Sequence, residues 1–292
     1  MILKQICNLT RQICLKLNIK RKVWNKIIDH SVNSITEKHI KTLCNTYILN
    51  LSEQNYWQWL AKTLLPFRAK AFPHKKALEF FFSSTILQLQ SEDHVMDMAG
   101  GRSDYLNMVK KVYGCDNVYL TDHIYSGVKK NSDGLTVVGG DISEINLPDS
   151  TFTKIACHHA FEHFQGDKDI DFIREIGRLL KPKGQACIIP LFLADRYVEC
   201  WNIDHKALFD ACAELIVDKS SSIPGAHDDG HFARFYSADA FRYRVIETAK
   251  DVNLSLLIVT CRVSGCDLPD MDKNFGSKLN YPLRALVLEK TE

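Results

Sequence analysis

Residues 95–103, VMDMAGGRS, place an acid inside a short apolar run and two glycines directly after it. A short apolar run bounded by glycine is typical of a buried strand. Glycine lets the chain turn tightly and lets a ligand approach the backbone. In open α/β sheets, ligands bind beyond the carboxyl ends of the strands. The stretch therefore predicts a strand that ends at a binding site, with Asp97, Gly100 and Gly101 beside it.

Short β-type runs and helical stretches alternate from His94 onward. The predicted strands are 94–99, 117–122, 135–141, 154–159, 185–192, 254–263 and 284–290, and the clearest helical patterns are 105–114, 169–180 and 237–250. Such alternation predicts a parallel sheet with helices on both faces. The last connection is too short for a helical crossover, so the final strand pair should be antiparallel, at one edge of the sheet. The predicted fold class is α/β, a Rossmann-like doubly wound sheet that is mostly parallel with an antiparallel last strand.

The N-terminal part of the chain has a different pattern. We expect residues 1–74 to form a helical N-terminal region and residues 75–292 to form the main domain, with an insert at about 192–235. The first thirty residues are basic, and apolar side chains recur in them at helical spacing, which predicts a basic amphipathic helix. This helix could pack on the domain or on a partner, contact a membrane surface, or act as an organelle presequence. Packing is the preferred alternative, because most amphipathic helices are simply packed.

Composition excludes several classes of protein. The 292 residues contain 37 Lys and Arg against 35 Asp and Glu, so the charge of +2 gives no electrostatic case for nucleic-acid binding. Ten cysteines occur without a CxxC pair, which argues against a zinc ribbon and favours a reducing, cytoplasmic compartment. No stretch approaches the roughly 18 uninterrupted apolar residues that a membrane span requires.

Acids also end the next two predicted strands. Asp122 follows Gly101 at a distance at which a carboxylate can accept hydrogen bonds from both hydroxyls of a ribose. The third strand ends at Asp141, where that side chain and the Ile142 backbone could read an adenine edge.

From about Val95 to Phe192 the sequence resembles the class I methyltransferases that use S-adenosylmethionine (SAM), in particular the methyltransferase 11-like group. Five motifs carry this resemblance in order: the acidic glycine turn at 97–103, Asp122, GGDISEINLPDSTF at 139–152, KIACHHAFEH at 154–163 and LLKPKG at 179–184. The family has glycine where this chain has Ala99, Ser103 and Lys183. We expect Gly184 to supply the left-handed conformation in place of residue 183.

The resemblance implies SAM as cofactor and S-adenosylhomocysteine as product. The Gly100–Gly101 turn would hold the amino-acid end of SAM, organised by Asp97, while Asp122 would bind the ribose. The residues expected at the cofactor are Asp97, Ala99, Gly100, Gly101, Asp122, Asp141, Ile142 and His158.

Two histidines are the candidates for catalysis, since a hydroxyl acceptor needs a base that works near neutral pH. His159 ends the fourth strand, where methyl donor and acceptor should meet, and His231 lies in the insert. Arg234 would favour an acceptor with phosphate or carboxylate. The further candidates for substrate contact are the aromatic residues Tyr197, Trp201 and Tyr236, for which core packing is the default.

The string His159-Ala-Phe-Glu162-His163 also occurs as a zinc-binding pattern in some peptidases. We expect no metal, because the family has a Glu-His at this place without one. Structural hydrogen bonds are the preferred explanation for Glu162 and His163.

The predicted function is methyl transfer from SAM to an acceptor, preferably a hydroxyl of a small molecule or a carbohydrate. One alternative is a non-catalytic SAM-binding or interaction module, in which the basic N-terminal helix docks a partner or a membrane. A nicotinamide-dependent Rossmann oxidoreductase is the other, although AGGRS fits the GxGxxG pattern poorly.

Overall fold

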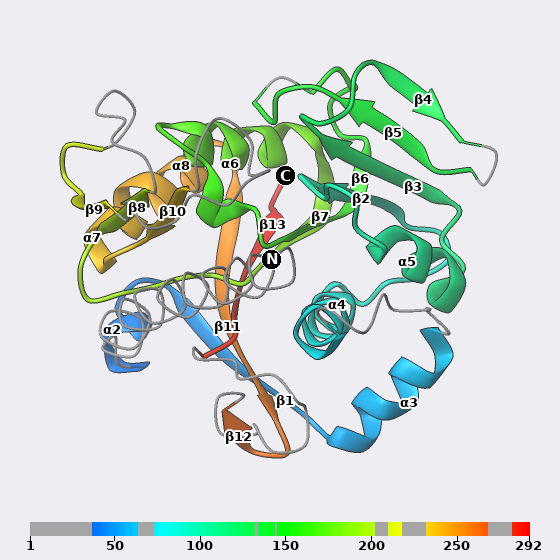
Figure 1. The fold of residues 1–292 in the computed structure, drawn as a ribbon, viewed down its shortest axis with the longest axis horizontal. Helices are drawn as coiled ribbons and strands as arrows, with labels where there is room; N and C mark the ends of the chain where they lie inside the picture. Colours follow the sequence, from blue (N-terminus) through cyan, green and yellow to red (C-terminus); the bar gives the residue numbers. More distant parts are fainter. Residues whose placement is uncertain are drawn as a thin grey trace, which may run out of the picture.

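The computed structural model describes residues 37–63, 73–131, 134–143, 145–201, 210–217, 232–267 and 282–292. Its centre is one large sheet with the strand order β1-β11-β13-β7-β6-β2-β3-β5-β4 (Figure 1). The strands are β1 (Asn45–Leu51), β2 (His94–Met98), β3 (Asn117–Asp122), β4 (Val128–Lys130), β5 (Thr136–Gly139), β6 (Phe152–His158), β7 (Leu180–Ile189), β11 (Leu254–Val263), β12 (Cys266–Asp267) and β13 (Arg284–Lys290). All seven strands predicted from His94 onward are present.

The sheet is mostly parallel, as predicted. β2 pairs in parallel with β3 and β6, β6 with β7, and β3 with β5. β13 is antiparallel to both β7 and β11, so the antiparallel last strand is confirmed. The prediction that this strand lies at an edge of the sheet is wrong, because β13 lies between β7 and β11. Its side chains are buried on both faces, and a strand of that kind belongs inside a sheet.

The prediction of a helical N-terminal region holds only in part. Two helices form there, α2 (Glu37–Lys41) and α3 (Glu53–Thr63), but β1 between them is a strand. It runs parallel to β11 over its whole length. The neighbouring strand supplies hydrogen bonds that a local sequence pattern does not show. Segments on both sides of the predicted boundary at residue 74 therefore share one sheet.

Helices cover both faces of the sheet (Figure 1). One layer contains α3, α4 (Pro73–Leu87) and α5 (Tyr105–Tyr113), and the other contains α6 (Lys168–Leu179) and α8 (Glu247–Asp251). Strand residues alternate between two hydrophobic clusters: Val95 and Cys187 belong to the first, and Met96 and Ile188 to the second. Alternation of this kind follows from the two-residue period of a strand. Both faces of the central strands are thus buried.

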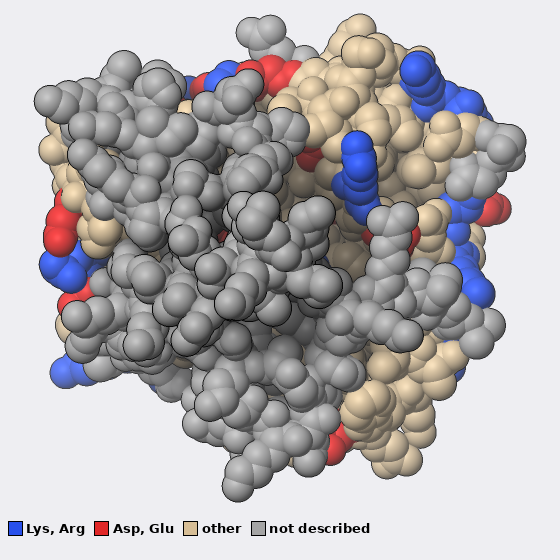
Figure 2. All heavy atoms as spheres, viewed as in Figure 1, with Lys and Arg blue, Asp and Glu red and all other residues tan. Residues whose placement is uncertain are grey.

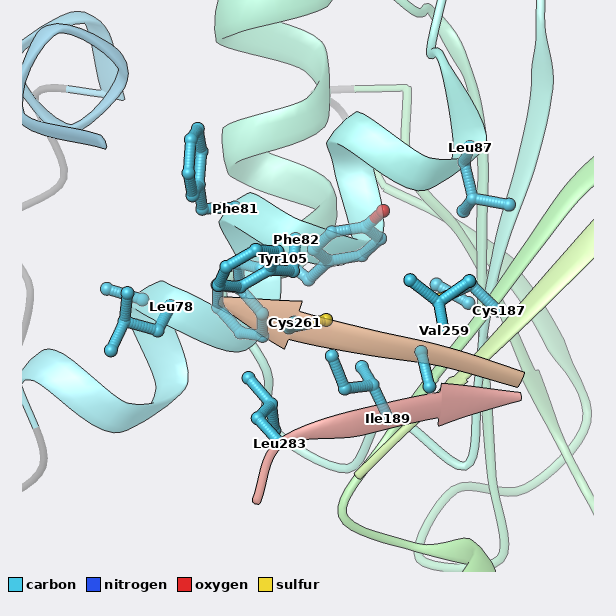
Figure 3. Packing of buried hydrophobic residues seen from close by; sticks show 14 of the residues in the cluster. Leu78, Phe81, Phe82, Leu87, Tyr105, Cys187, Ile189, Val259, Cys261 and Leu283 are labelled. Carbon is cyan, nitrogen blue, oxygen red and sulfur yellow. The ribbon is translucent and has the colours of Figure 1, made fainter. Parts of the chain in front are cut away.

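The first cluster fixes α4 and α5 against the sheet. Figure 3 shows Phe82 and Tyr105 from these two helices above the strands that carry Ile189 and Val259. Burying one such side chain stabilises the fold by about 1.5–3 kcal/mol. This packing fixes the layer of α4 and α5 next to the carboxyl ends of β2 and β6.

The predicted insert contains a small second sheet. Its strands are β8 (Val198–Trp201), β9 (Glu214–Val217) and β10 (Phe232–Phe235), in the order β10-β8-β9. A helical stretch follows, made of α7 (Ala238–Phe241), a π-helical segment (Arg242–Ile246) and α8. Ser237 caps it as predicted, since its Oγ accepts a hydrogen bond of 3.2 Å from the Ala240 backbone N–H.

Within the described part of the chain, no helix has the length and apolar character that crossing a bilayer requires. Basic and acidic side chains both occur on the described part of the face drawn in Figure 2. The basic segment at the start of the chain and His231 lie outside the described residues, as does the side chain of Trp201.

Candidate active site

The carboxyl ends of β2, β3 and β6 lie next to one another in the sheet and bring four predicted site residues together. β2 ends in the turn that contains Gly100 and Gly101, β3 ends at Asp122, and β6 ends at His158. The Gly100 backbone N–H donates a 3.1 Å hydrogen bond to the carbonyl of Thr121, which ties the glycine turn to the end of β3. These segments therefore form one continuous site.

Asp122 is held in one orientation by backbone donors. Its Oδ2 accepts a hydrogen bond of 2.8 Å from the Gly101 N–H, and its Oδ1 accepts one of 3.1 Å from the Ile124 N–H. The hydroxyl of Tyr125 donates a 2.8 Å bond back to the Gly101 carbonyl. Asp122 is buried, with 7% of its surface exposed. A carboxylate fixed in this way can accept hydrogen bonds from a ligand with little loss of side-chain entropy.

The turn after β2 needs its glycines for two different reasons. A Cβ at Gly100 would lie 2.5 Å from Asp97 Oδ2, which excludes any side chain unless the carboxylate moves. Gly101 has φ +57° and occupies the left-handed region, which glycine adopts without strain. Ala99 has φ +57° as well, at the place where the family has glycine. That conformation costs a non-glycine residue about 1–2 kcal/mol.

The start of β7, where the register of its pairing with β6 shifts, differs from the prediction. Lys183 itself adopts the left-handed conformation, with φ +64°, so the expectation that Gly184 would supply it is wrong. Gly184 is required by close packing instead, because a Cβ there would lie 2.8 Å from the carbonyl oxygen of Lys181.

His158 lies between the acid of β2 and helix α4. Its Nδ1 is 3.4 Å from Asp97 Oδ1, and its Nε2 is 2.8 Å from the hydroxyl oxygen of Ser83. The ring also packs against Tyr105, with centroids 4.4 Å apart. Asp97 is fully buried, and its Oδ2 has no hydrogen-bond partner among the described residues. The sequence analysis missed Ser83, which follows the apolar run ALEFFF in α4.

His159 is held from both ring nitrogens. Nε2 is 2.7 Å from Glu79 Oε1, and Nδ1 is 3.0 Å from Glu162 Oε1. Burial alone would lower the pKa of His159, but the two carboxylates outweigh it and raise that pKa. Burial would raise the pKa of Glu162, whereas the contacts with His159 and His163 bring it down to about 2. His159 thus lies between two carboxylates that favour its protonated form, on a strained backbone with φ +52°.

The sequence analysis predicted the role of Glu162 and His163 but not that of Glu79. Glu79 was missed, although an acid inside the apolar run ALEFFF of α4 is an unusual signal. His163 Nδ1 lies 2.6 Å from the Phe232 carbonyl oxygen, so Glu162 and His163 do make the structural hydrogen bonds that the sequence analysis preferred.

Asp141 and Ile142 follow β5 at a more open position. Asp141 Oδ1 accepts hydrogen bonds from the Ser143 N–H (2.9 Å) and from Lys168 Nζ (3.0 Å). Burial would raise its pKa, but the donors from Ser143 and Lys168 lower it to about 2. Its side chain is 52% exposed, while Ile142 packs in part against the second cluster. Asp141 thus remains available at the surface of the site.

Three residues predicted to contact the acceptor meet in a buried polar network. The guanidinium of Arg234 is fully buried, donates to Glu199 Oε1 over 2.8 and 3.0 Å, and lies 2.7 Å from Asp169 Oδ1. Tyr236 donates a 2.8 Å hydrogen bond to Asp169, and Tyr197 donates one of 3.2 Å to Glu199. The polar groups of these side chains pair with one another, so these residues first of all stabilise the fold of the insert.

Arg244 completes the network and was missed in the sequence. It donates to Asp169 Oδ1 over 2.6 Å and to Oδ2 over 2.8 Å, and it binds Asp210 over 2.8 Å. Burial would raise the pKa of Asp169, but the two arginines lower it. The π-helical segment carries Arg244, and a π-turn shifts a side chain relative to regular helical spacing. The network joins β8, β10, α6 and this helix.

The residues present fit the cofactor that the sequence implies. Asp97 Oδ2 is a buried carboxylate oxygen without a partner among the described residues, next to the cradle that a Cβ at Gly100 would fill. Asp122 presents an oriented carboxylate beside that cradle. Backbone at close approach and fixed acceptors are the groups that bind an amino-acid tail and a ribose.

A comparison with protein families gave a match. Residues 96–188 match the family model described as "Methyltransferase domain". A search of curated protein sequences gave no match.

Several solved structures share weak similarity. One is a methyltransferase from Haloferax volcanii in complex with a methyltransferase activator, at 14% identity over 81% of this chain and 98% of that chain, with a TM-score of 0.49. Another is the 1,6-didemethyltoxoflavin-N1-methyltransferase of Burkholderia thailandensis, at 12% identity over 81% and 87% of the two chains, with a TM-score of 0.45. A SAM-dependent methyltransferase from Mesorhizobium loti has 12% identity over 72% and 97%, with a TM-score of 0.48.

The ordered motifs, the glycine turn closed on Asp122 and the family match apply to the same part of the chain. The match assigns residues 96–188 to a methyltransferase domain.

Proposed function

We propose that the protein transfers the methyl group of SAM to a hydroxyl of a small molecule or a sugar. The observation that carries the cofactor half of this proposal is the glycine turn hydrogen-bonded to Asp122, with the buried Asp97 beside it. The acceptor half rests on the polar insert and on the absence of a strongly basic composition, which disfavours nucleic acid.

Each cofactor residue has a proposed role. Asp122 accepts hydrogen bonds from the ribose hydroxyls, and the Gly100–Gly101 turn holds the amino-acid end. Asp141 and the backbone of Ile142 border the adenine, where the exposed carboxylate and the half-buried side chain leave an open edge. Asp97, Ala99 and His158 are further candidates for cofactor contact.

Bound SAM supplies a methyl group that is already activated by its sulfonium. The protein then has to align donor and acceptor and to exclude water. His158 ends β6 and His159 follows it, and both rings contact side chains of α4. For a hydroxyl acceptor, a base must also take the proton.

His159 can take that proton only in its neutral form. The carboxylates of Glu79 and Glu162 raise the pKa of His159, which favours its protonated form over the neutral form that a base needs. His231, in the insert, is the second candidate base. We propose that one of these two histidines is the general base. Loss of methyl transfer in His159→Gln or in His231→Gln would show which one it is.

The insert at about 192–235 is the proposed acceptor-binding segment of the main domain. Arg234 is paired with Glu199 and Asp169, and Tyr197 and Tyr236 bind the same carboxylates. We propose that these three residues and Trp201 shape the acceptor pocket, with Arg234 acting through the fold of the insert. Because β1 pairs with β11, we also propose that residues 37–63 fold with the main domain.

The experiment that tests this function is calorimetric titration of the full chain with S-adenosylhomocysteine, for the wild type and for Asp122→Ala. Micromolar binding that is lost in the variant supports the cofactor site. Labelled SAM with a panel of sugars and phenols then tests the acceptor. Binding without consumption of SAM in the presence of any acceptor would favour a non-catalytic SAM-binding module.

A further inference from the structure

The loop that follows Asp122 contains one aromatic side chain that turns inward. Residues 123–127 link β3 to β4 (Figure 1), and all of them except Tyr125 are exposed. Tyr125 is half-buried and packs against the first hydrophobic cluster. Its hydroxyl donates a 2.8 Å hydrogen bond to the Gly101 carbonyl, in the turn after β2. A side chain of this loop is thus hydrogen-bonded to the backbone of the glycine turn.

The backbone of Tyr125 is fixed from two sides. Its N–H donates a hydrogen bond of 3.3 Å to the Asp122 carbonyl, which closes a turn at the end of β3. A Cβ added to Gly139 of β5 would lie 2.2 Å from the carbonyl carbon of Tyr125, so these two backbones are in close contact. Glycine at position 139 allows this approach because it has no side chain. The Tyr125 hydroxyl therefore reaches Gly101 from a backbone position that β3 and β5 determine.

Two different side chains hold the two backbone groups of Gly101. Its N–H donates to Asp122 Oδ2 over 2.8 Å, and its carbonyl accepts from Tyr125. Asp122 has a further backbone donor, the Ile124 N–H, which is 3.1 Å from Oδ1. Removing the Tyr125 hydroxyl therefore frees the Gly101 carbonyl, while both backbone hydrogen bonds that orient the Asp122 carboxylate remain.

Gly101 depends on such a restraint because it has no side chain of its own. At φ +57° it occupies a region that glycine enters and leaves more readily than other residues. The Gly101 carbonyl and the Arg102 N–H belong to one planar peptide group, so a hydrogen bond to the carbonyl also sets the direction of that N–H. Successive backbone N–H groups in a turn are donors that bind an anionic group such as a carboxylate. The Tyr125 hydroxyl thus restrains the direction of an amide donor in the glycine turn.

We infer that Tyr125 is a positioning residue that holds the glycine turn in the conformation that binds the amino-acid end of the cofactor. This inference rests on the proposed function, in which the turn holds that end and Asp122 binds the ribose. Tyr125 acts through the Gly101 peptide and not by touching the cofactor. Because Asp122 keeps its own backbone donors, the contribution of Tyr125 is confined to the amino-acid end and leaves the ribose contact unchanged.

The test compares two ligands that differ only at the amino-acid end. S-adenosylhomocysteine has this end, whereas methylthioadenosine has the same adenine, ribose and sulfur with a methyl group in its place. Dissociation constants for both are measured by direct or competition calorimetry on the full chain, for the wild type and for Tyr125→Phe, which removes only the hydroxyl. Loss of this hydrogen bond should weaken binding of S-adenosylhomocysteine by roughly three- to tenfold. Binding of methylthioadenosine should stay unchanged.

Tyr119→Phe is the matched control. Tyr119 lies in β3, and its ring packs against Phe152 of the second hydrophobic cluster, with centroids 5.0 Å apart. This variant also removes a tyrosine hydroxyl and should leave both dissociation constants unchanged. A role of Tyr125 in general stability alone predicts that both ligands weaken together, and circular dichroism shows whether each variant is folded.

The outcomes distinguish this inference from the proposed function. Equal weakening of both ligands in Tyr125→Phe, or no weakening of either, overturns the inference while the cofactor assignment stands. A Tyr125→Phe protein that does not fold also overturns it, because the hydroxyl then serves the fold as a whole. If the wild type binds methylthioadenosine as tightly as S-adenosylhomocysteine, the turn does not hold the amino-acid end and the inference fails with that role. If the folded wild type binds neither ligand, the proposed function itself fails.

Discussion

Gly101 and Asp122 are joined by a hydrogen bond of 2.8 Å, donated by the glycine N–H to the aspartate Oδ2, across 21 residues of sequence. This contact closes the turn after β2 onto the end of β3 and orients the carboxylate. The same acid therefore has a structural partner and, in the proposed function, a ligand partner.

Replacing Asp122 should weaken cofactor binding more than it weakens the fold. A hydrogen bond to a charged group contributes about 1.5–3 kcal/mol, so Asp122→Ala should raise the dissociation constant of S-adenosylhomocysteine by roughly 10- to 100-fold. Asp122→Asn should give a smaller loss, because it keeps one acceptor oxygen. Calorimetric titration measures both. Asp116→Ala, at an exposed position before β3, is the matched control, and equal losses in both variants would contradict the assignment.

Glycine at position 99 should stabilise the protein. Ala99 has φ +57°, a conformation that costs about 1–2 kcal/mol for a residue with a Cβ, partly offset by the entropy of the more flexible glycine chain. We expect Ala99→Gly to raise the free energy of unfolding by about 0.5–1 kcal/mol in urea titrations. Ala186→Gly, in the buried strand β7, should destabilise instead. A loss of stability in both variants would rule out strain at Ala99.

Disrupting the buried network around Asp169 should strongly destabilise the protein. Asp169 is fully buried and pairs with Arg234 and Arg244, so Asp169→Ala leaves two buried guanidinium groups without their shared carboxylate. Removing one partner of a buried ion pair typically costs about 3–5 kcal/mol. The exposed pair Arg174–Asp171 is the control, because Arg174→Ala should cost at most about 1 kcal/mol. Urea unfolding measures both losses, and similar values for the two variants would refute a special role for Asp169.

Glu162→Gln should destabilise the protein in a pH-dependent way. Folding lowers the pKa of Glu162 from 4.5 to about 2, so its contribution is present above pH 4.5 and is lost as the pH falls toward 2. Folding raises the pKa of His159 above 6.5, so that contribution is complete below pH 6.5 and is lost as the pH rises through the folded-state pKa.

The loss of stability in Glu162→Gln should therefore be largest between about pH 4.5 and 6.5 and smaller on both sides. Urea unfolding at pH 3, 5.5 and 9 tests this, with the exposed Glu92→Gln as a control whose effect should not vary with pH. A loss that is constant with pH would show that the contact between His159 and Glu162 is not ionic.

Most of the fold, and the glycine turn that lies beside Asp122, could be predicted from the sequence. The strands from β2 onward follow from apolar runs separated by helical periods, and Asp97, Gly101 and Asp122 follow from turns at strand ends. These signals are local, because a strand, a helix cap or a glycine turn depends on residues close in sequence. The antiparallel last strand was also predictable, since its short connection leaves no room for a crossover helix.

Tertiary contacts decided the rest. The position of β13 inside the sheet and the strand β1 depend on pairing with β11, which no local pattern encodes. Glu79 reaches His159 across 80 residues, and Arg244 reaches Asp169 across 75. A buried charge is stable only where its partner lies, and that partner is supplied by another element of the fold. The sequence by itself determined where the glycine turn after β2 lies, and only the packed structure determined which histidine nitrogens and guanidinium groups already have partners.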